Sequence, residues 1–418
     1  MTGVGPRRVL FLGLGHLSNG DVSIAADFAR QLPADRFEVG FVTAAPVAPY
    51  VRATGLKVFP LEYPARGSDP AHDPRRNLAA FDQLVADFEP DLLVAADAFT
   101  LDYSTAWSGL SMSLLRQRYD VALGSFDQYD YPAADYLVDF YGGHRTRFPR
   151  LLEQCDLLIR NSPLNRPAPS EPGIVVSRMV CGGSAPMRVD RHRTGPPTVF
   201  LTNSRWEYVN VVRSPGMAQL MLAMPRIIHG HLAALQRPLR VVHVGPARWD
   251  FPVAEQIDYR YVPKLPPSDF HARLASADLF VTGNAVSVTL TQAVLAGVPS
   301  LLLDNHKILD VGRLLASGSA PAWLAQTAPE LTIAYPYRVF PWGWHSFLTP
   351  VLSGNPYVDC FRSAGVFERR RVLRAMTELL DEPAARARLA EAQATLLDRL
   401  DALPPAGDAL DAAKLTGR

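Results

Sequence analysis

The sequence predicts an α/β protein with two parallel-sheet domains, and three observations carry this prediction. The 418 residues are too many for one ordinary hydrophobic core and suit two domains of roughly 150–200 residues each. Short continuous apolar runs alternate with longer segments whose apolar residues have helical spacing, which is typical of parallel strands covered on both faces. A proline- and arginine-rich stretch at 165–197 interrupts the alternation, which then starts again. Two doubly wound domains that face each other across a cleft fit this pattern.

The first half of the chain contains four strand candidates before the interruption. The apolar run VLFLGLG opens the series, and residues 22–32 after it carry apolar positions at helical spacing. A second helix is expected through about 81–88, and the interrupting stretch holds one more possible strand at 173–180. The four expected strands are 8–15, 37–44, 56–62 and 90–99.

The second half repeats the alternation and ends in a long helix. The expected strands are 198–203, 239–245, 259–265, 278–284 and 299–304. The expected helices are 219–235, 269–277, 288–296 and 381–402. The chain is therefore expected to divide into domains at 1–190 and 191–375, followed by a C-terminal helix and tail at 376–418.

Composition excludes several classes of protein. Apolar residues make up 48% of the chain and charged residues 20%, which excludes a disordered protein and a soluble coiled coil. The formal net charge of +1 is too small for the broad positive field that holds a nucleic-acid backbone. Cys155, Cys181 and Cys360 are odd in number and form no CxxC pair, so neither a disulfide framework nor a structural zinc site is expected. The chain has no signal-peptide pattern and no run near the roughly 20 apolar residues of a membrane span, which predicts a cytoplasmic protein.

One segment of the second half has a specific order of parts. In residues 263–304 a proline-containing turn precedes a short helix, the residues ASAD enter a strand, and a small polar loop opens a helix that AGVP links to the next strand. This order resembles the donor half of GT-B glycosyltransferases, a family with two Rossmann-like domains that holds a nucleotide sugar in the cleft between them. The resemblance covers 259–304 most closely and 7–100 more loosely. It implies an acceptor-binding domain at 1–190 and a donor-binding domain at 191–375.

The loop at 282–289 offers a physical reason for donor binding. It opens a helix, so the free N–H groups of the first turn and the helix dipole can hold a pyrophosphate, and the hydroxyls of Ser287 and Thr289 can add donors. The resemblance places Gln292 on the nucleotide ribose. An alternative is that the segment is only a strand, a polar turn and a packing helix, with Ser and Thr as N-caps. Many relatives have His-Gly-Gly where this chain has Asn284-Ala285-Val286, which restricts how closely the backbone approaches a phosphate.

Two further places complete the expected donor site. Ser204 and Arg205 follow the first strand of the second half, where they could reach a phosphate. Asp304 and Asn305 stand where relatives bind the sugar hydroxyls, with a solvated turn as the alternative. The donor-site candidates are Ser204, Arg205, Gly283, Asn284, Ser287, Val288, Thr289, Gln292, Asp304 and Asn305.

The first half carries the catalytic candidates. His16 follows the first strand, where inverting members of the family often have a catalytic histidine, and an imidazole suits the removal of a proton from an acceptor. Asp97 is the candidate carboxylate that orients this histidine, with Asp102 as the second choice. A structural histidine that bonds the backbone is the alternative. The glycines near His16 lack the third glycine of a dinucleotide fingerprint, so NAD binding is not expected, and Asp21 is expected as an N-cap.

The predicted activity is the metal-independent transfer of a sugar from a nucleotide-diphosphate donor to a small acceptor, with inversion, in bacterial natural-product or antibiotic biosynthesis. UDP, TDP and GDP remain alternatives for the donor, and O- and S-linkage for the product. No separate cofactor is expected, and no Asp-x-Asp motif for a metal is present. A nucleotide-sugar 2-epimerase and a non-catalytic partner protein are the rival functions, and a homodimer stays open. The aromatic segments 126–144 and 335–348 could wall a pocket, cap the cleft or form a dimer contact.

Overall fold

The computed structural model divides the chain into two compact units. The first contains Met1–Gly183 and Asp398–Arg418, and the second contains Ser184–Leu397. The long helix α18 (Pro383–Asp401) therefore begins in the second unit and ends in the first. The structure describes residues 5–15, 20–64, 72–128, 130, 137–140, 144–179, 195–203, 215–284, 287–305, 309–334 and 352–413.

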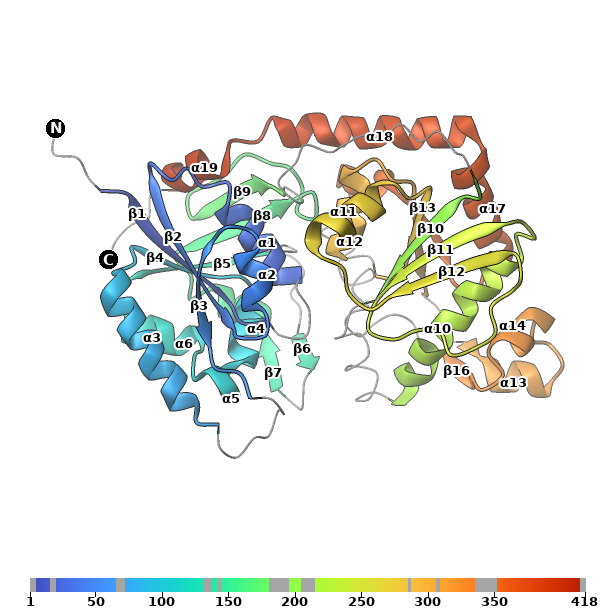
Figure 1. The fold of residues 1–418 in the computed structure, drawn as a ribbon, viewed down its shortest axis with the longest axis horizontal. Helices are drawn as coiled ribbons and strands as arrows, with labels where there is room; N and C mark the ends of the chain where they lie inside the picture. Colours follow the sequence, from blue (N-terminus) through green and yellow to red (C-terminus); the bar gives the residue numbers. More distant parts are fainter. Residues whose placement is uncertain are drawn as a thin grey trace. The chain divides into compact units, whose positions relative to one another are not determined.

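The first unit is built on a seven-stranded sheet in the order β3-β2-β1-β4-β5-β8-β9, in which every neighbouring pair is parallel (Figure 1). The strand order reverses between β1 and β4. The strands are β1 (Arg7–Gly13), β2 (Phe37–Ala44), β3 (Lys57–Leu61), β4 (Leu92–Ala95), β5 (Ala122–Phe126), β8 (Leu157–Ser162) and β9 (Ile174–Arg178). A separate antiparallel pair, β6 (Leu137–Phe140) and β7 (His144–Arg147), lies in and just beyond the aromatic segment 126–144.

Aromatic rings fill the core of the first unit. Phe11 of β1 is fully buried and stacks on Phe41 of β2 with ring centroids 6.1 Å apart. Phe28 meets Phe11 edge-on at 6.2 Å, and burying rings of this size stabilises the fold by about 1.5–3 kcal/mol each. The last residue of β1, Gly13, has no room for a side chain, because a Cβ there would stand 2.6 Å from the Phe41 ring. The helices of this unit are α1 (Gly20–Ala29), α2 (Ala48–Arg52), α3 (Pro74–Phe88), α4 (Ala98–Tyr103), α5 (Thr105–Ser108), α6 (Met112–Arg118), α8 (Phe148–Leu152) and α19 (Ala406–Ala412).

The second unit is built on a six-stranded parallel sheet in the order β12-β11-β10-β13-β14-β17 (Figure 1). Its order reverses between β10 and β13. The strands are β10 (Thr198–Thr202), β11 (Leu239–Val244), β12 (Ile257–Val262), β13 (Leu279–Thr282), β14 (Ser300–Asp304) and β17 (Arg362–Gly365). The predicted class, two Rossmann-like parallel sheets, is confirmed.

Alternate residues of the central strands face opposite layers of helices. Val199 and Leu201 belong to the core cluster that also contains residues of α10 (Pro215–Ala233) and α17 (Arg369–Asp381). Phe200, between them, packs edge-on against Phe270 of α11 (Pro267–Ala275) at 5.5 Å. Because successive side chains of a strand point to opposite faces, these apolar strands bury side chains on both faces of the sheet. The remaining elements are α12 (Val288–Leu295), β15 (Leu309–Asp310), α13 (Val311–Ala316), α14 (Ala322–Thr327), β16 (Ile333–Ala334) and the 3-10 helix η1 (Pro356–Cys360).

One expected strand is much shorter than predicted. The run 90–99 forms only β4, which ends at Ala95, because Asp97 caps the next helix. The Asp97 carboxylate accepts a hydrogen bond of 2.6 Å from the Thr100 N–H, which begins α4 at Ala98. Ala98, within the expected strand, is buried as a residue of α4, so the continuous apolar pattern did not distinguish strand from helix. No helix of the described residues is long and apolar enough to cross a membrane.

Candidate functional site

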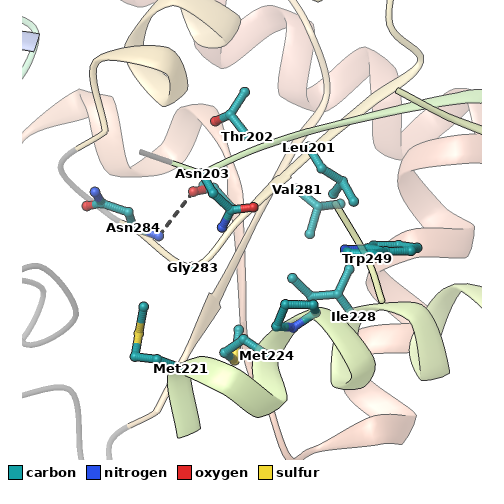
Figure 2. Close-up of a pocket in the computed structure, with 12 residues that line it drawn as sticks. Leu201, Thr202, Asn203, Met221, Met224, Ile228, Trp249, Val281, Gly283 and Asn284 are labelled. Atoms are coloured by element: carbon teal, nitrogen blue, oxygen red, sulfur yellow. Dashed lines mark hydrogen bonds between the residues drawn. The ribbon is translucent and has the colours of Figure 1, made fainter. Parts of the chain in front are cut away.

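The second sheet carries a pocket at the point where its strand order reverses. Loops that leave neighbouring strands toward opposite faces open a crevice at the carboxyl ends, and ligands of open α/β sheets bind there. The pocket is lined by residues 201–203 at the end of β10 and 281–284 at the end of β13 (Figure 2). The side chains that close it are Met221, Met224, Pro225 and Ile228 of α10 and Trp249 after β11.

The pocket has an apolar floor and an uncharged polar rim. Met221, Met224 and Ile228 supply the floor, and Thr202 and Asn203 are two of the rim residues. The space between the lining atoms totals about 530 Å³, part of it open solvent. Methionines adapt their shape more readily than other core residues, so Met221 and Met224 allow this wall of the pocket to adjust to a ligand.

A chain of hydrogen bonds lies beside this pocket. The His243 Nε2 is 2.8 Å from the Asn203 Oδ1, and the His243 Nδ1 is 2.8 Å from the Tyr259 hydroxyl. The backbone N–H of Trp249 donates to the same hydroxyl at 3.1 Å, while the Trp249 ring stacks on the Tyr259 ring at 4.5 Å. His243 is 1% exposed, and burial lowers its pKa to about 4. The imidazole is therefore neutral at pH 7.

The loop and helix after β13 show the cap of α12. The Ser287 hydroxyl accepts the Thr289 N–H at 3.1 Å, so Ser287 is the N-cap of α12, as the alternative interpretation expects. The Asn284 N–H donates to the Thr282 hydroxyl at 3.1 Å, and Gly283 and Asn284 line the pocket. Gln292 is 8% exposed, one turn into the helix that begins at Val288. The prediction that this helix end holds a diphosphate stays a prediction.

Asp304 and Asn305 are buried, with 6% and 5% of their surface exposed. The Asp304 carboxylate accepts a hydrogen bond from the Ser363 hydroxyl, and its backbone oxygen accepts the Val366 N–H at 2.7 Å. The alternative of a solvated turn is therefore wrong for both residues. The Asp304 side chain joins β14 to β17, and its predicted contact with a sugar stays a prediction.

In the first unit the described catalytic candidate is Asp97, and the structure brings it near a second carboxylate. Thr100 connects the two: its N–H donates to Asp97, and its hydroxyl donates to the Asp21 Oδ2 at 3.2 Å. The Gln128 amide donates to the Asp21 Oδ1 at 3.2 Å. Asp21 therefore does not have the expected N-cap role, because it lies inside the first turn of α1 and its carboxylate bonds residues of other elements.

Burial and repulsion govern the charge of this carboxyl pair. Burial, followed by the nearby Asp21 carboxylate, raises the pKa of Asp97 to about 7, against hydrogen bonds from Thr100 and Phe99. Burial likewise raises the pKa of Asp21, which Gln128 and Thr100 partly oppose. Two carboxyl groups this close cannot both ionise freely, so the pair retains a proton near pH 7. His16, Ser204 and Arg205 lie outside the described residues.

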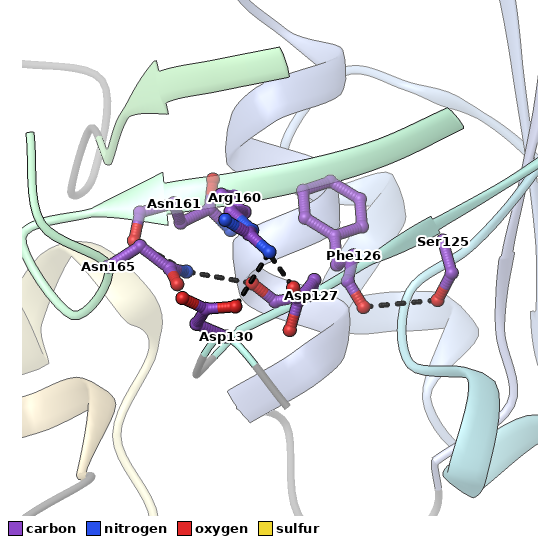
Figure 3. A network of polar contacts seen from close by, with 7 residues as sticks. All are labelled: Ser125, Phe126, Asp127, Asp130, Arg160, Asn161 and Asn165. Atoms are coloured by element: carbon purple, nitrogen blue, oxygen red, sulfur yellow. Dashed lines mark hydrogen bonds and ion pairs between the residues drawn. The ribbon is translucent and has the colours of Figure 1, made fainter. Parts of the chain in front are cut away.

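A second polar network lies at the carboxyl end of β5 (Figure 3). Arg160 of β8 holds two carboxylates, Asp127 through Nε at 3.0 Å and Asp130 through Nη2 at 2.7 Å. Asn165 donates to the Asp127 backbone oxygen at 2.7 Å. Asp127 is fully buried, and Asp130 has a left-handed φ of 48°. This network fastens the start of the aromatic segment 126–144 to β8, whereas 335–348 lies outside the described residues.

The sequence analysis did not identify Asn203, His243, Trp249 and Arg160, and it gave Asp21 only the role of an N-cap. A polar side chain within a buried strand was the available signal for His243 and Arg160, because such a group needs a partner. Asn203 directly precedes Ser204, one of the candidates, but nothing in the sequence connects it to His243 forty residues later. Among the described residues, no group of three or more His, Cys, Asp or Glu side chains could hold a metal ion.

Two parallel sheets, each with a reversal of strand order, define this chain as a protein of the GT-B fold. The spinosyn forosaminyltransferase SpnP is similar with a TM-score of 0.59 and 15% identity, over 98% of this chain and 99% of that one. The spinosyn rhamnosyltransferase SpnG complexed with thymidine diphosphate is similar with a TM-score of 0.54 and 13% identity, over 97% of this chain and 99% of that one. A putative UDP-N-acetylglucosamine 2-epimerase from Listeria monocytogenes is similar with a TM-score of 0.54 and 13% identity, over 98% of this chain and 94% of that one. At these identities the similarity establishes the fold alone.

The chain belongs to DUF6365, a family of unknown function, which residues 28–415 match. The search of curated proteins found no match.

Proposed function

We propose that this protein is a glycosyltransferase that moves a sugar from a nucleotide-diphosphate donor to a small-molecule acceptor in natural-product biosynthesis. The observation that carries the proposal is the pocket at the strand-order reversal of the second sheet, lined by the loop that leads into α12. The GT-B fold adds support, because structures similar over nearly the whole chain include a rhamnosyltransferase complexed with thymidine diphosphate.

The donor's diphosphate would lie at the amino end of α12. The helix dipole and the N–H group at Val288 favour negative charge there, and the loop residues Gly283, Asn284 and Ser287 lead into this end. Gln292 would bond the ribose. The other proposed donor contacts are Ser204, Arg205, Asp304 and Asn305. No metal is invoked, since a helix end and uncharged donors can stabilise the charge of the leaving diphosphate.

His16 would be the general base and Asp97 the group that orients it. The acceptor oxygen attacks the anomeric carbon, the bond from that carbon to the phosphate oxygen breaks, and the acceptor proton passes to the imidazole. A thiol acceptor could instead react as a thiolate, which reduces the need for the base. In this arrangement the Asp97 carboxylate stabilises the imidazolium that forms.

Thermal denaturation in the presence of UDP, TDP or GDP tests this proposal. A ligand that binds only the folded state raises the apparent melting temperature, so we expect one of the three diphosphates to do so. A Gln292→Ala variant is the matched comparison, with a melting shift smaller than wild type at the same ligand concentration. A wild-type protein whose melting temperature none of the three diphosphates raises would contradict the proposal.

A nucleotide-sugar 2-epimerase is the second candidate. The carboxyl pair of Asp21 and Asp97 favours it, since two neighbouring carboxyl groups can remove and return protons, and the Listeria monocytogenes protein shares the fold. Incubation with a nucleotide sugar and no acceptor separates the two functions. A product whose sugar has changed stereochemistry favours the epimerase, whereas unchanged donor without acceptor and glycosylated acceptor with it favours the transferase.

A further inference from the structure

Asn203 lies on the rim of the second unit's pocket and is held from several sides. Its N–H donates to the Val244 backbone oxygen at 3.2 Å, and its side-chain oxygen faces His243. Gly245 leaves room for its backbone, because a Cβ at that position would stand 3.1 Å from the Asn203 oxygen. The backbone of Asn203 is thus fixed, and its side chain can turn either its oxygen or its nitrogen to His243 Nε2. Which of the two it turns depends on whether Nε2 carries the proton of the imidazole.

The hydrogen bonds of Tyr259 determine that tautomer. The Tyr259 hydroxyl already accepts the backbone N–H of Trp249, so its single proton is available to His243 Nδ1. If His243 donated from Nδ1 instead, this half-buried hydroxyl proton would lose its partner, which is costly in an apolar setting. Nδ1 is thus the acceptor, and the proton of the neutral imidazole resides on Nε2.

The tautomer in turn orients the amide. Nε2–H donates to the Asn203 Oδ1 at 2.8 Å, which engages the acceptor end of the side chain. The amide nitrogen, with two hydrogens, is the end turned to other groups of the pocket (Figure 2). The opposite tautomer would reverse the amide and present an acceptor to the same space. The chain from Trp249 through Tyr259 and His243 therefore selects a donor at this position.

We propose that Asn203 donates an amide N–H to an acceptor oxygen of the nucleotide-sugar donor, and that His243 and Tyr259 are positioning residues that hold it in this orientation. The inference rests on the proposed function and adds a specificity-determining residue to it. The ligand oxygen that accepts this N–H belongs either to the diphosphate or to the sugar, and the oxygens of both groups are hydrogen-bond acceptors. Stacking of Trp249 on Tyr259 and on Phe251, at 4.5 and 5.3 Å, keeps the chain rigid.

Titration calorimetry with UDP, TDP, GDP and UDP-glucose tests the role of Asn203. Asn203→Asp has the same shape but places an oxygen where the amide nitrogen was, and we expect it to weaken binding by about tenfold or more. Asn203→Ala should weaken binding by less, since it removes the donor without adding repulsion. A loss seen with the bare diphosphate assigns the oxygen to the diphosphate, and a loss seen only with UDP-glucose assigns it to the sugar.

Tyr259→Phe tests the positioning chain, with Tyr261→Phe as the matched control two residues along the same strand. The Tyr261 hydroxyl donates to the Gly245 oxygen at 2.9 Å and does not bond His243. We expect Tyr259→Phe to weaken ligand binding severalfold and to populate the Nδ1–H tautomer of His243 in ¹⁵N NMR spectra. We expect Tyr261→Phe to leave the tautomer and the affinity unchanged.

The outcomes separate this inference from the proposed function. A wild-type protein that binds all four nucleotides no more tightly than its Asn203→Asp variant does would overturn the role of Asn203 alone. A wild-type His243 with its proton on Nδ1 would overturn the positioning chain. Failure of the folded wild-type protein to bind any of the four nucleotides would overturn both proposals.

Discussion

At the scale of single residues, the carboxyl pair in the first unit makes the charge of Asp97 depend on pH in an unusual range. The folded state raises the pKa of Asp97 to about 7 through burial and the neighbouring Asp21. The unfolded chain releases this proton at an ordinary carboxyl pKa near about 3.9. The free energy of unfolding therefore decreases as pH rises from about 4 to 7, because the folded state retains a proton that the unfolded state has lost.

Asp97→Asn should remove this pH dependence. Asparagine keeps an oxygen for the Thr100 N–H, so the cap of α4 survives, while the burial of a charge beside Asp21 disappears. At pH 8 we expect the free energy of unfolding of the variant to exceed that of wild type, on the order of a few kcal/mol. At pH 4 we expect little difference between the two proteins. Urea unfolding at both pH values measures this, and a stability difference independent of pH would contradict the account.

His16→Ala tests the proposed base. If the imidazole accepts the acceptor's proton, turnover should fall by about 10²–10⁴-fold with an alcohol or phenol acceptor. Turnover with a thiol acceptor should fall much less, since a thiolate forms without a base. Steady-state rates with one acceptor of each kind give the comparison, and full activity with the alcohol would remove His16 from the catalytic role.

At the scale of elements, α12 is the helix on which the donor proposal depends, and its N-cap permits a test that separates stability from binding. Ser287→Ala loses the hydrogen bond to the Thr289 N–H and should lower the free energy of unfolding by about 1 kcal/mol. Ser287→Asp retains a capping oxygen and adds a negative charge, which favours a helix amino end. The stability of Ser287→Asp should therefore match or exceed that of wild type.

Binding should respond in the opposite order. The carboxylate that Ser287→Asp introduces would repel a diphosphate at the same helix end, so we expect this variant to bind UDP, TDP or GDP at least about tenfold more weakly than Ser287→Ala does. Calorimetry on the two variants, beside urea unfolding, provides both numbers. Equal affinities in the two variants would exclude the amino end of α12 from the donor site.

The elements also show what sequence could predict. The alternation of apolar runs and helical spacing located most strands of both sheets but not β5, β8 and β17. The order of parts at 263–304 located β13 and α12, because these signals are local in the chain. The contact of Asn203 with His243 is not local. It arises because β10 and β11 pair with Leu201 opposite His243, and β11 and β12 pair with Tyr259 opposite Val241, two residues before His243. Only the register of three strands creates this chain of hydrogen bonds, and no pattern within one segment reports it.

At the scale of the whole molecule, two buried histidines make stability sensitive to acid. Burial lowers the pKa of His231 and of His243 to about 4, and both side chains are at most 1% exposed. The unfolded chain binds these protons near about pH 6.5, so their contribution to stability is fully present above that pH and is lost as pH falls toward 4. The loss is about 3 kcal/mol for each histidine.

This acid sensitivity opposes the effect of Asp97 over nearly the same range. Two histidines outweigh one carboxyl up to about pH 6.5, and above that pH only the Asp97 effect remains, so stability should be greatest at about pH 6–7. Urea unfolding between pH 4.5 and 8 measures the optimum, and NMR titration of the histidine ring protons tests its cause. Protonation of either histidine in the folded protein near pH 6.5 would contradict the assignment of the acid limb.

The return of the chain end to the first unit yields a prediction about the integrity of that unit. In α19, Leu410 is fully buried and Ala406 and Ala409 are each 2% exposed, and the helix packs against β9, the last strand of the sheet. Arg36 also bonds Asp408 and Asp411, at 2.8 and 2.9 Å, but these side chains are largely exposed, and ion pairs of this kind contribute little. Apolar burial therefore holds α19 in place.

A chain that ends at Leu403 should consequently lose more stability in the first unit than the point variant Arg36→Gln does. Removing α19 uncovers Leu410's apolar contacts and the edge strand β9, and the lost burial corresponds to about 2–4 kcal/mol. Amide hydrogen exchange should accelerate in β9 and β1 of the shortened chain, while β10 of the second unit keeps its wild-type rates. If Arg36→Gln accelerated exchange in β9 as much as the truncation, the ion pairs rather than the buried leucine would be the dominant contact.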